Sequence, residues 1–95
     1  MNVTVPFLKS LLGTTSQECI DFPFAISSNG YGDMIMNGIR ESAHRCMCRL
    51  AHGEPPKDKP YALHNCKNNK KCINPNHLRW GTQLENTHEY YVDLL

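Results

Sequence analysis

The chain has 95 residues, 40% of them hydrophobic, and a formal net charge of +1. This size predicts one domain whose core gives modest stability, so additional stabilisation, for example by a bound metal ion, is expected. The sequence contains no run of about eighteen apolar residues, which excludes a membrane-spanning helix, and nothing near Met1 resembles a signal peptide.

Five cysteines are present, an odd number that does not suit a complete set of disulfides. In a reducing cytoplasm, which is the expected location, cysteines act as metal ligands or as buried apolar residues. The net charge gives no global sign of nucleic-acid binding, but lysines are concentrated in one stretch: Lys57, Lys59, Lys67, Lys70 and Lys71. A local basic face that meets phosphate and a merely solvated loop are equal alternatives.

The first half of the chain is expected to form a helical turn and a small antiparallel sheet. Residues 5–12 read as one or two helical turns. Residues 19–26 are apolar and aromatic, and Pro23 restricts them to an edge strand or a bulged strand. Residues 33–38 predict a second strand that ends in an Asn-Gly hairpin turn.

The second half is expected to hold a helix, two strands and a final helix. Helical spacing of apolar residues over 42–53 ends at a glycine that two prolines soon follow. Strands are predicted at 61–64 and 77–81, with a polar loop between them. A capping-box pattern starts at Thr82 and predicts a helix to about Val92. No internal repeat is visible, and one domain is expected over residues 1–95, with the parts 1–41, 42–53 and 61–93.

The loop between these two strands carries residues with the spacing of a zinc site. Cys66 and Cys72 are followed by His77 at a similar interval. One loop of this kind can wrap around a single ion and present two sulfurs and one imidazole nitrogen to it. Three ligands are therefore predicted within the loop.

The fourth ligand of a structural zinc must come from an upstream cysteine. Cys46 and Cys48 lie two residues apart on the predicted helix and point in different directions, so at most one of them binds. Cys19 begins the strand predicted at 19–26 and can reach across to the loop. The residues alone leave Cys19 and Cys48 nearly equal, and the alternative for each cysteine is a small buried apolar residue.

Two polar residues flank this loop. His64 lies two residues before Cys66, and Asn86 falls in the first turn of the last predicted helix. If that helix packs across the strands, both residues face one groove. There a neutral imidazole can take a proton from water, and an amide oxygen can help to hold an ion such as Mg²⁺. Taken alone, a histidine or an asparagine in such a position is more often an ordinary structural residue. Only their joint placement around the predicted zinc loop favours a functional role.

Four segments together resemble a known enzyme family: AHRCMCRLAHGEPP, ALHNC, KKCINPNHLRWGT and LEN. They are similar to phage-type HNH endonucleases (the ββα-metal, or His-Me finger, superfamily) and to the His-Cys box homing endonucleases. The resemblance covers roughly residues 18–88. It implies an α+β fold, in which a small zinc-stabilised ββα-metal motif is preceded by a short antiparallel sheet and a helix.

The resemblance also implies an activity and its residues. The activity is metal-dependent hydrolysis of DNA phosphodiester bonds, by nicking or by double-strand cleavage, in the cytoplasm of a bacterium or its phage. His64 matches the general base, and Asn86 matches the ligand of a catalytic Mg²⁺ or Mn²⁺ ion. Cys66, Cys72 and His77 match ligands of a structural Zn²⁺ ion.

The same resemblance favours Cys19 as the fourth zinc ligand, with Cys48 as the alternative. Residues 19–23 (CIDFP) are similar to the setting of the upstream zinc-binding cysteine in His-Cys box enzymes. Arg40 is the positional match of an arginine that contacts the cleaved phosphate, and Arg45 is close enough in sequence to be its alternative.

The chain departs from the homing enzymes in size. It lacks their long DNA-reading sheet and the extended tail through which they dimerise, so neither high sequence specificity nor the same dimer is implied. The expected partner is the phosphate backbone of double-stranded DNA, bound by a monomer or a homodimer. The alternative is a non-catalytic zinc-containing nucleic-acid-binding module, in which the zinc loop is only a scaffold and the lysines hold phosphate.

Overall fold

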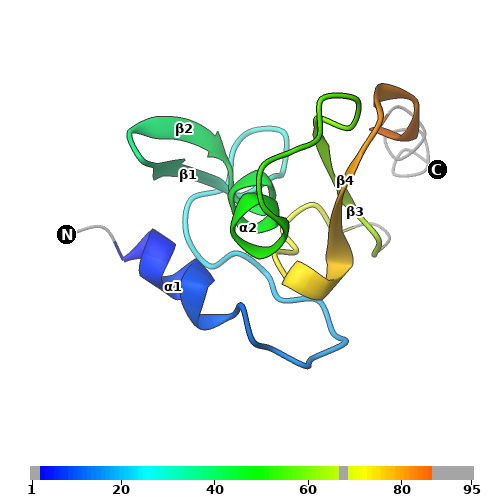
Figure 1. Ribbon diagram of the computed structural model, residues 1–95. Coiled ribbons are helices and arrows are strands. Elements are labelled where there is room, and N and C mark those ends of the chain that lie inside the picture. Colours follow the sequence, from blue (N-terminus) through cyan, green and yellow to red (C-terminus); the bar gives the residue numbers. More distant parts are fainter. Residues whose placement is uncertain (1–2, 67–68, 87–95) are drawn as a thin grey trace.

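The elements follow one another as a helix, a hairpin, a second helix and a second hairpin (Figure 1). The computed structural model describes residues 3–66 and 69–86. Two separate two-stranded antiparallel sheets lie on either side of helix α2, Ala43–His52 (Figure 1). The predicted α+β class is confirmed at this level.

The first half contains helix α1 and the first hairpin. Helix α1 spans Thr4–Ser10. Strands β1, Asp33–Met36, and β2, Ile39–Ser42, pair in antiparallel register. Asn37 and Gly38 join them with φ angles of 53° and 79°. Positive φ at both positions is what a two-residue hairpin turn of this kind requires, so the predicted Asn-Gly turn is confirmed.

The strand expected at residues 19–26 is wrong. In the described part of the chain this segment makes only isolated bridges, which pair Asp21 with Cys72 and Ile26 with Gly32. Pro23 has no N–H to donate, and the residues on its two sides bond to different partners. Before it, the N–H of Phe22 donates to the carbonyl of Lys71; after it, the N–H of Asp33 donates to the carbonyl of Ala25. The segment therefore connects the two halves of the molecule without forming a strand.

Helix α2 follows β2 directly. Its span confirms the helix predicted over 42–53. Ser42 occupies the N-cap in an extended conformation, and Gly53 ends the helix with a φ of 79°. Glycine reaches such a φ without steric cost, which explains where the helix stops. The buried residues of the helix lie in its first two turns and are Ala43, Cys46, Met47 and Cys48.

The second hairpin lies on the other side of α2. Strands β3, Tyr61–His64, and β4, Leu78–Gly81, pair antiparallel with His64 opposite Leu78. A short 3-10 turn, η1 at Pro75–His77, leads directly into β4. Both predicted strands are confirmed, the second beginning one residue later than expected.

The capping box predicted after β4 is present. The N–H of Thr82 donates to the Glu85 carboxylate at 3.0 Å, and the N–H of Glu85 donates to the Thr82 hydroxyl at 3.2 Å. Residues 83–86 are helical and include Asn86. The predicted continuation to Val92, and with it the end of the 61–93 part, lies outside the described residues.

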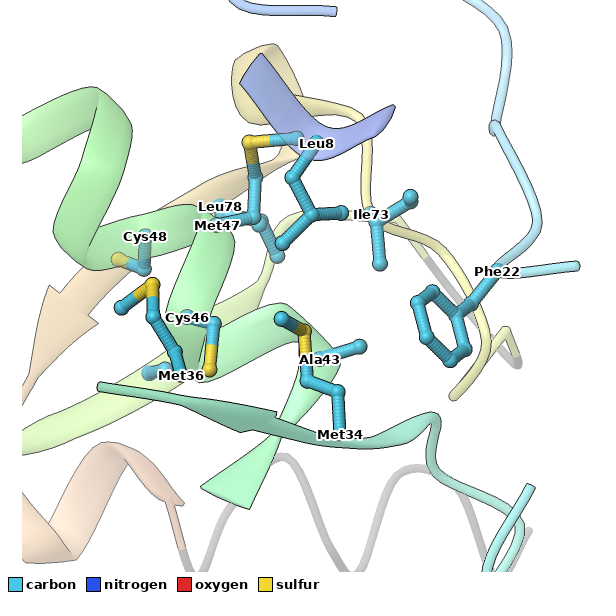
Figure 2. Packing of buried hydrophobic residues seen from close by; sticks show 11 residues of the cluster. Leu8, Phe22, Met34, Met36, Ala43, Cys46, Met47, Cys48, Ile73 and Leu78 are labelled. Carbon is cyan, nitrogen blue, oxygen red and sulfur yellow. The ribbon is translucent and has the colours of Figure 1, made fainter. Parts of the chain in front are cut away.

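Side chains from both halves of the chain meet on α2 to form the core (Figure 2). Met34 and Met36 point from β1 toward the helix, while Leu8 from α1 and Ile73 from the loop before η1 cover its other side. Flexible methionine side chains suit such a small, irregular interior. Among the described helices, none combines the length and the apolar character needed to cross a bilayer.

Cys46 and Cys48 belong to this core. Both are fully buried, and burial raises the pKa of each thiol to about 11. The two thiols therefore stay uncharged at neutral pH and pack as small apolar groups.

Candidate metal centre and neighbouring histidines

Three cysteines and one histidine meet where the segment after α1 runs along η1 (Figure 1). Their ligand atoms all lie within 4.8 Å of one another, and the four residues are Cys19, Cys66, Cys72 and His77. Three come from the loop between β3 and β4, and the fourth comes from far upstream. The structure thus brings together the four predicted residues, with Cys19 in the cluster and Cys48 in the core.

The distances inside the cluster suit a tetrahedral ion. Nδ1 of His77 lies 3.5 Å from Sγ of Cys72 and 3.6 Å from Sγ of Cys19. Zn–S bonds of about 2.3 Å and Zn–N bonds of about 2.0 Å, at tetrahedral angles, place sulfur and nitrogen about 3.5 Å apart. The cluster can therefore hold Zn²⁺ in its present geometry.

The imidazole of His77 is oriented for ligation through Nδ1. Its Nε2 lies 2.9 Å from the carbonyl oxygen of Gln17. A carbonyl only accepts, so Nε2 carries the proton and the lone pair of the neutral ring is on Nδ1, which faces the sulfurs. Zinc-binding histidines commonly donate their other ring N–H to a carbonyl in this way.

The thiols of the loop need a cation to ionise. Burial raises the pKa of both Cys66 and Cys72, and the neighbouring sulfurs raise it further at Cys66. Backbone N–H groups of Asn74 and Ile20 act in the opposite direction at Cys72. A bound divalent ion favours the thiolate outright, so metal binding at this cluster releases protons.

Asn74 explains how Cys19 reaches the loop. Asn74 is fully buried, and its Nδ2 donates to the carbonyls of Ser16 at 3.0 Å and Glu18 at 2.7 Å. Its Oδ1 accepts the N–H of Asn76 at 2.9 Å. These bonds hold the segment before Cys19 against η1. The sequence analysis missed this role, for which an asparagine directly before a proline, a common helix-start pattern, was the available signal.

His64 lies beside the metal centre, at the end of β3. Its Nε2 donates to the backbone carbonyl of Cys72 at 2.9 Å. As at His77, a carbonyl partner puts the proton on Nε2 and the lone pair of the neutral ring on Nδ1. The orientation of His64 is thus linked directly to the loop that carries the cysteines.

Two aromatic rings that the sequence analysis missed pack near His64. Ring centroids of His44 and Tyr31 lie 4.7 Å and 6.1 Å from that of His64, and both rings are nearly parallel to it. The available signal for His44 was its position beside the apolar face of the predicted helix. Tyr31 had no comparable signal, because its segment has no regular periodicity.

Asn86 is partly buried in the turn at 83–86, where its N–H donates to the carbonyl of Thr82 at 3.0 Å. Within residues 3–66 and 69–86, the Cys/His cluster is the one group of three or more metal-binding side chains that converge.

The two candidate arginines lie on different elements. Arg40 is exposed on β2 and forms an ion pair with Asp33 inside the first hairpin. Arg45 is on α2, with its guanidinium carbon 5.1 Å from the centroid of the Trp80 ring on β4. Arg45 therefore touches the hairpin that carries His64.

Of the five lysines that are candidates for a basic face, Lys70 lies near the Tyr31 ring. The ammonium of Lys70 is 5.5 Å from the centroid of the Tyr31 ring. Lys57, Lys59 and Lys71 are exposed, and Lys67 lies outside the described residues.

No family model and no solved structure match this sequence. The chain is 30% identical over 73 residues to Protein 7.7 of Escherichia phage T7. That match covers 77% of this chain and 55% of the phage protein, so the chain spans about half the length of the curated relative that it matches.

Proposed function

We propose that the protein is a metal-dependent DNA endonuclease of the HNH kind, with a structural zinc in the Cys/His cluster and His64 as the general base. The observation that carries this proposal is the hydrogen bond from Nε2 of His64 to the carbonyl of Cys72. It assigns the lone pair to Nδ1, the atom that would take a proton from water. It also makes a zinc ligand the residue that orients the base.

The proposed reaction is hydrolysis of a phosphodiester. His64 removes a proton from a water molecule, whose oxygen attacks phosphorus opposite the 3′ oxygen. The bond from phosphorus to that oxygen breaks, the leaving 3′ oxygen takes a proton from solvent water, and the products carry a 5′-phosphate and a 3′-hydroxyl. His64 then releases its proton to solvent, which restores the neutral ring for the next cycle.

Asn86 is the proposed ligand of a catalytic divalent ion. Its amide oxygen is a hard donor of the kind that Mg²⁺ and Mn²⁺ take, and a single protein ligand leaves positions open for water and phosphate. When bound, such an ion supplies positive charge to the phosphate and to the leaving oxygen. The Thr82–Glu85 capping box supports this role, because it fixes the turn that carries Asn86.

The phosphate backbone of double-stranded DNA is the proposed partner. Arg40 is the first candidate for the cleaved phosphate: its side chain is 75% exposed, and the surface ion pair that it would give up contributes little. Arg45 is the alternative, because it follows His44 on α2 and touches β4 through Trp80. The exposed lysines would add contacts that are independent of sequence.

The phage relative supports a setting in a phage or its bacterial host. The name of that relative states no activity, so the nuclease proposal depends on the geometry around His64 and on the family resemblance of the sequence.

The test compares two histidine variants in a plasmid-nicking assay with Mg²⁺. In His64→Ala the rate should fall by a factor of about 100 or more, because the base is lost, while DNA binding and zinc content stay unchanged. His52→Ala is the matched control. His52 also bonds to a backbone carbonyl through Nε2, that of Pro75 at 3.1 Å, but it lies outside the proposed site.

Three results would contradict the proposal. Wild-type protein that binds DNA but leaves the plasmid intact with Mg²⁺ or Mn²⁺ would indicate the non-catalytic zinc module instead. Cutting by His64→Ala at the wild-type rate would remove the base from the mechanism. Equal losses in His64→Ala and His52→Ala would point to a general effect on folding.

A further inference from the structure

The rings of Tyr31, His44 and His64 form a cluster between the two hairpins. Tyr31 and His44 have centroids 4.9 Å apart at an interplanar angle of 24°, and His44 and His64 have centroids 4.7 Å apart at the same angle. The three rings come from the segment before β1, from the first turn of α2 and from the end of β3. His44 is the member that contacts both of the others most closely.

His44 is fixed to the strand that carries His64. Its Nε2 donates to the carbonyl of Ala62 at 3.1 Å, two residues before His64 on β3. The ring therefore has one edge bonded to the strand and one face against the imidazole of His64. Two such contacts determine both the position and the tilt of the His44 ring.

The other nitrogen of His44 is buried, so the ring acts on its neighbours through its bond to Ala62 and through its faces. Nδ1 is shut off from solvent and has no hydrogen-bond partner among the residues that the structure describes. A buried acceptor without a partner is costly, and a hydrocarbon ring would fill the same volume without that cost. Burial, followed by the proximity of His64, lowers the pKa of His44 to about 3. The ring is therefore neutral at working pH and places no positive charge against His64.

The geometry points to His44 as a positioning residue that holds the imidazole of His64 in the orientation in which Nε2 donates to the Cys72 carbonyl. The hydrogen bond to Cys72 fixes one edge of the His64 ring, and the face of His44 prevents the ring from turning about that bond. The catalytic consequence rests on the proposed nuclease function, whereas the orientation itself does not.

The experiment uses three variants of His44 in the full, zinc-loaded protein. His44→Ala removes the ring, His44→Phe keeps the face but not the bond to Ala62, and His44→Gln can keep that bond without the ring. The readouts are the kcat and KM of plasmid nicking, the zinc content, and long-range ¹H–¹⁵N NMR spectra that report which nitrogen of His64 carries the proton.

We expect His44→Ala and His44→Gln to lower kcat about tenfold or more with little change in KM, because a small misplacement of a base is enough for such a loss. In their spectra the single Nε2–H form of His64 should give way to a mixture of both forms. His44→Phe should recover most of the rate and the single form. His52→Ala, which also removes an α2 histidine bonded to a carbonyl, should resemble the wild type.

Two outcomes would overturn the inference. One is a wild-type rate and a single Nε2–H form of His64 in His44→Ala. The other is that His44→Gln keeps the nicking rate and the single Nε2–H form of His64 while His44→Phe loses both. That result would mean that His44 only anchors β3. If His44→Ala does not fold, the Phe and Gln pair decides. If the wild type cuts no DNA, the nuclease proposal fails, while the NMR spectra still decide whether His44 orients His64.

Discussion

The core around α2 and the centre in the loop between β3 and β4 both use cysteines, but in opposite ways. Cys46 and Cys48 are fully buried and neutral, and their thiols occupy the place of an apolar group. Cys66 and Cys72 lie instead within 4.8 Å of two further ligand atoms. Burial raises the thiol pKa in both regions, but only the second offers a geometry in which a cation can reverse the effect. The role of a cysteine here follows from its neighbours and not from its burial.

Replacing one cysteine from each region should give the largest difference. Cys72→Ala is expected to abolish stoichiometric zinc binding, because it removes one of the four ligands. Stability should fall with it, since a structural zinc site contributes binding energy on the order of 10 kcal/mol to folding. Cys48→Ala should keep full zinc content and cost only about 1 kcal/mol of stability. Metal analysis and thermal unfolding measure both effects. Zinc retained in Cys72→Ala, or lost in Cys48→Ala, would break the contrast between the two regions.

Asn74 holds the segment before Cys19 against η1, and replacing it should give the next largest effect on stability. Asn74→Ala removes the buried donor to the Glu18 carbonyl, one of two donors to the Ser16 carbonyl and the acceptor of the Asn76 N–H, and should lower the free energy of unfolding by about 3 kcal/mol. Asn76→Ala removes two exposed bonds, from Nδ2 to the Thr14 carbonyl at 3.0 Å and to the Ser16 carbonyl at 3.4 Å, and should cost less than about 1 kcal/mol. Urea unfolding with zinc present compares them. Equal losses would mean that the buried amide is not the main contact.

The α2 region contains a titratable group whose effect on stability depends on pH. The folded-state pKa of His44 is about 3, below its ordinary value of 6.5. Between these values the unfolded chain binds a proton that the folded chain does not, so stability falls as the pH is lowered through this window. The slope is at most about 1.4 kcal/mol per pH unit.

His44→Phe should remove this slope. Urea unfolding of both proteins at pH 7.0 and 5.5 measures it as a difference, in which the protonation of the zinc ligands contributes equally to each. Wild type should lose more stability than His44→Phe over this interval. Parallel losses in the two proteins would show that the buried ring does not titrate on unfolding.

The smallest effect on stability is expected at the first hairpin. Arg40→Ala should change the free energy of unfolding by no more than about 0.5 kcal/mol, because the Arg40 side chain in its ion pair with Asp33 is 75% exposed. If Arg40 contacts the cleaved phosphate, nicking should nevertheless slow about tenfold. A wild-type rate in Arg40→Ala combined with a slow Arg45→Ala would assign the phosphate to Arg45.

Elements with strong local signals could be predicted from the sequence. The helix over Ala43–His52 has apolar spacing and a glycine stop, and the Asn-Gly turn between β1 and β2 has a conformation that few other residue pairs adopt. Three ligands of the metal centre could be recognised because they lie close together in one loop. In each case the information is local in the sequence.

Contacts between distant segments could not be predicted in this way. Residues 19–26 have the composition of a strand, but their hydrogen bonds go to two separate segments that no local pattern reveals. The carbonyl partners of His64, His77 and Asn74 are backbone groups, which every residue carries, so the sequence holds no sign of them. For the same reason, spacing alone could not decide between Cys19 and Cys48 as the fourth ligand.

The position of Cys19 has a consequence for the order of folding. Cys19 leaves the ribosome well before the other three residues of the cluster, which follow within residues 66–77. If zinc binds as proposed, it cross-links Cys19 to residues 66–77 and closes a large loop. Closing a long loop lowers the conformational entropy of the unfolded chain more than a cross-link between residues close in sequence. The supply of metal during synthesis would then decide when the N-terminal segment docks.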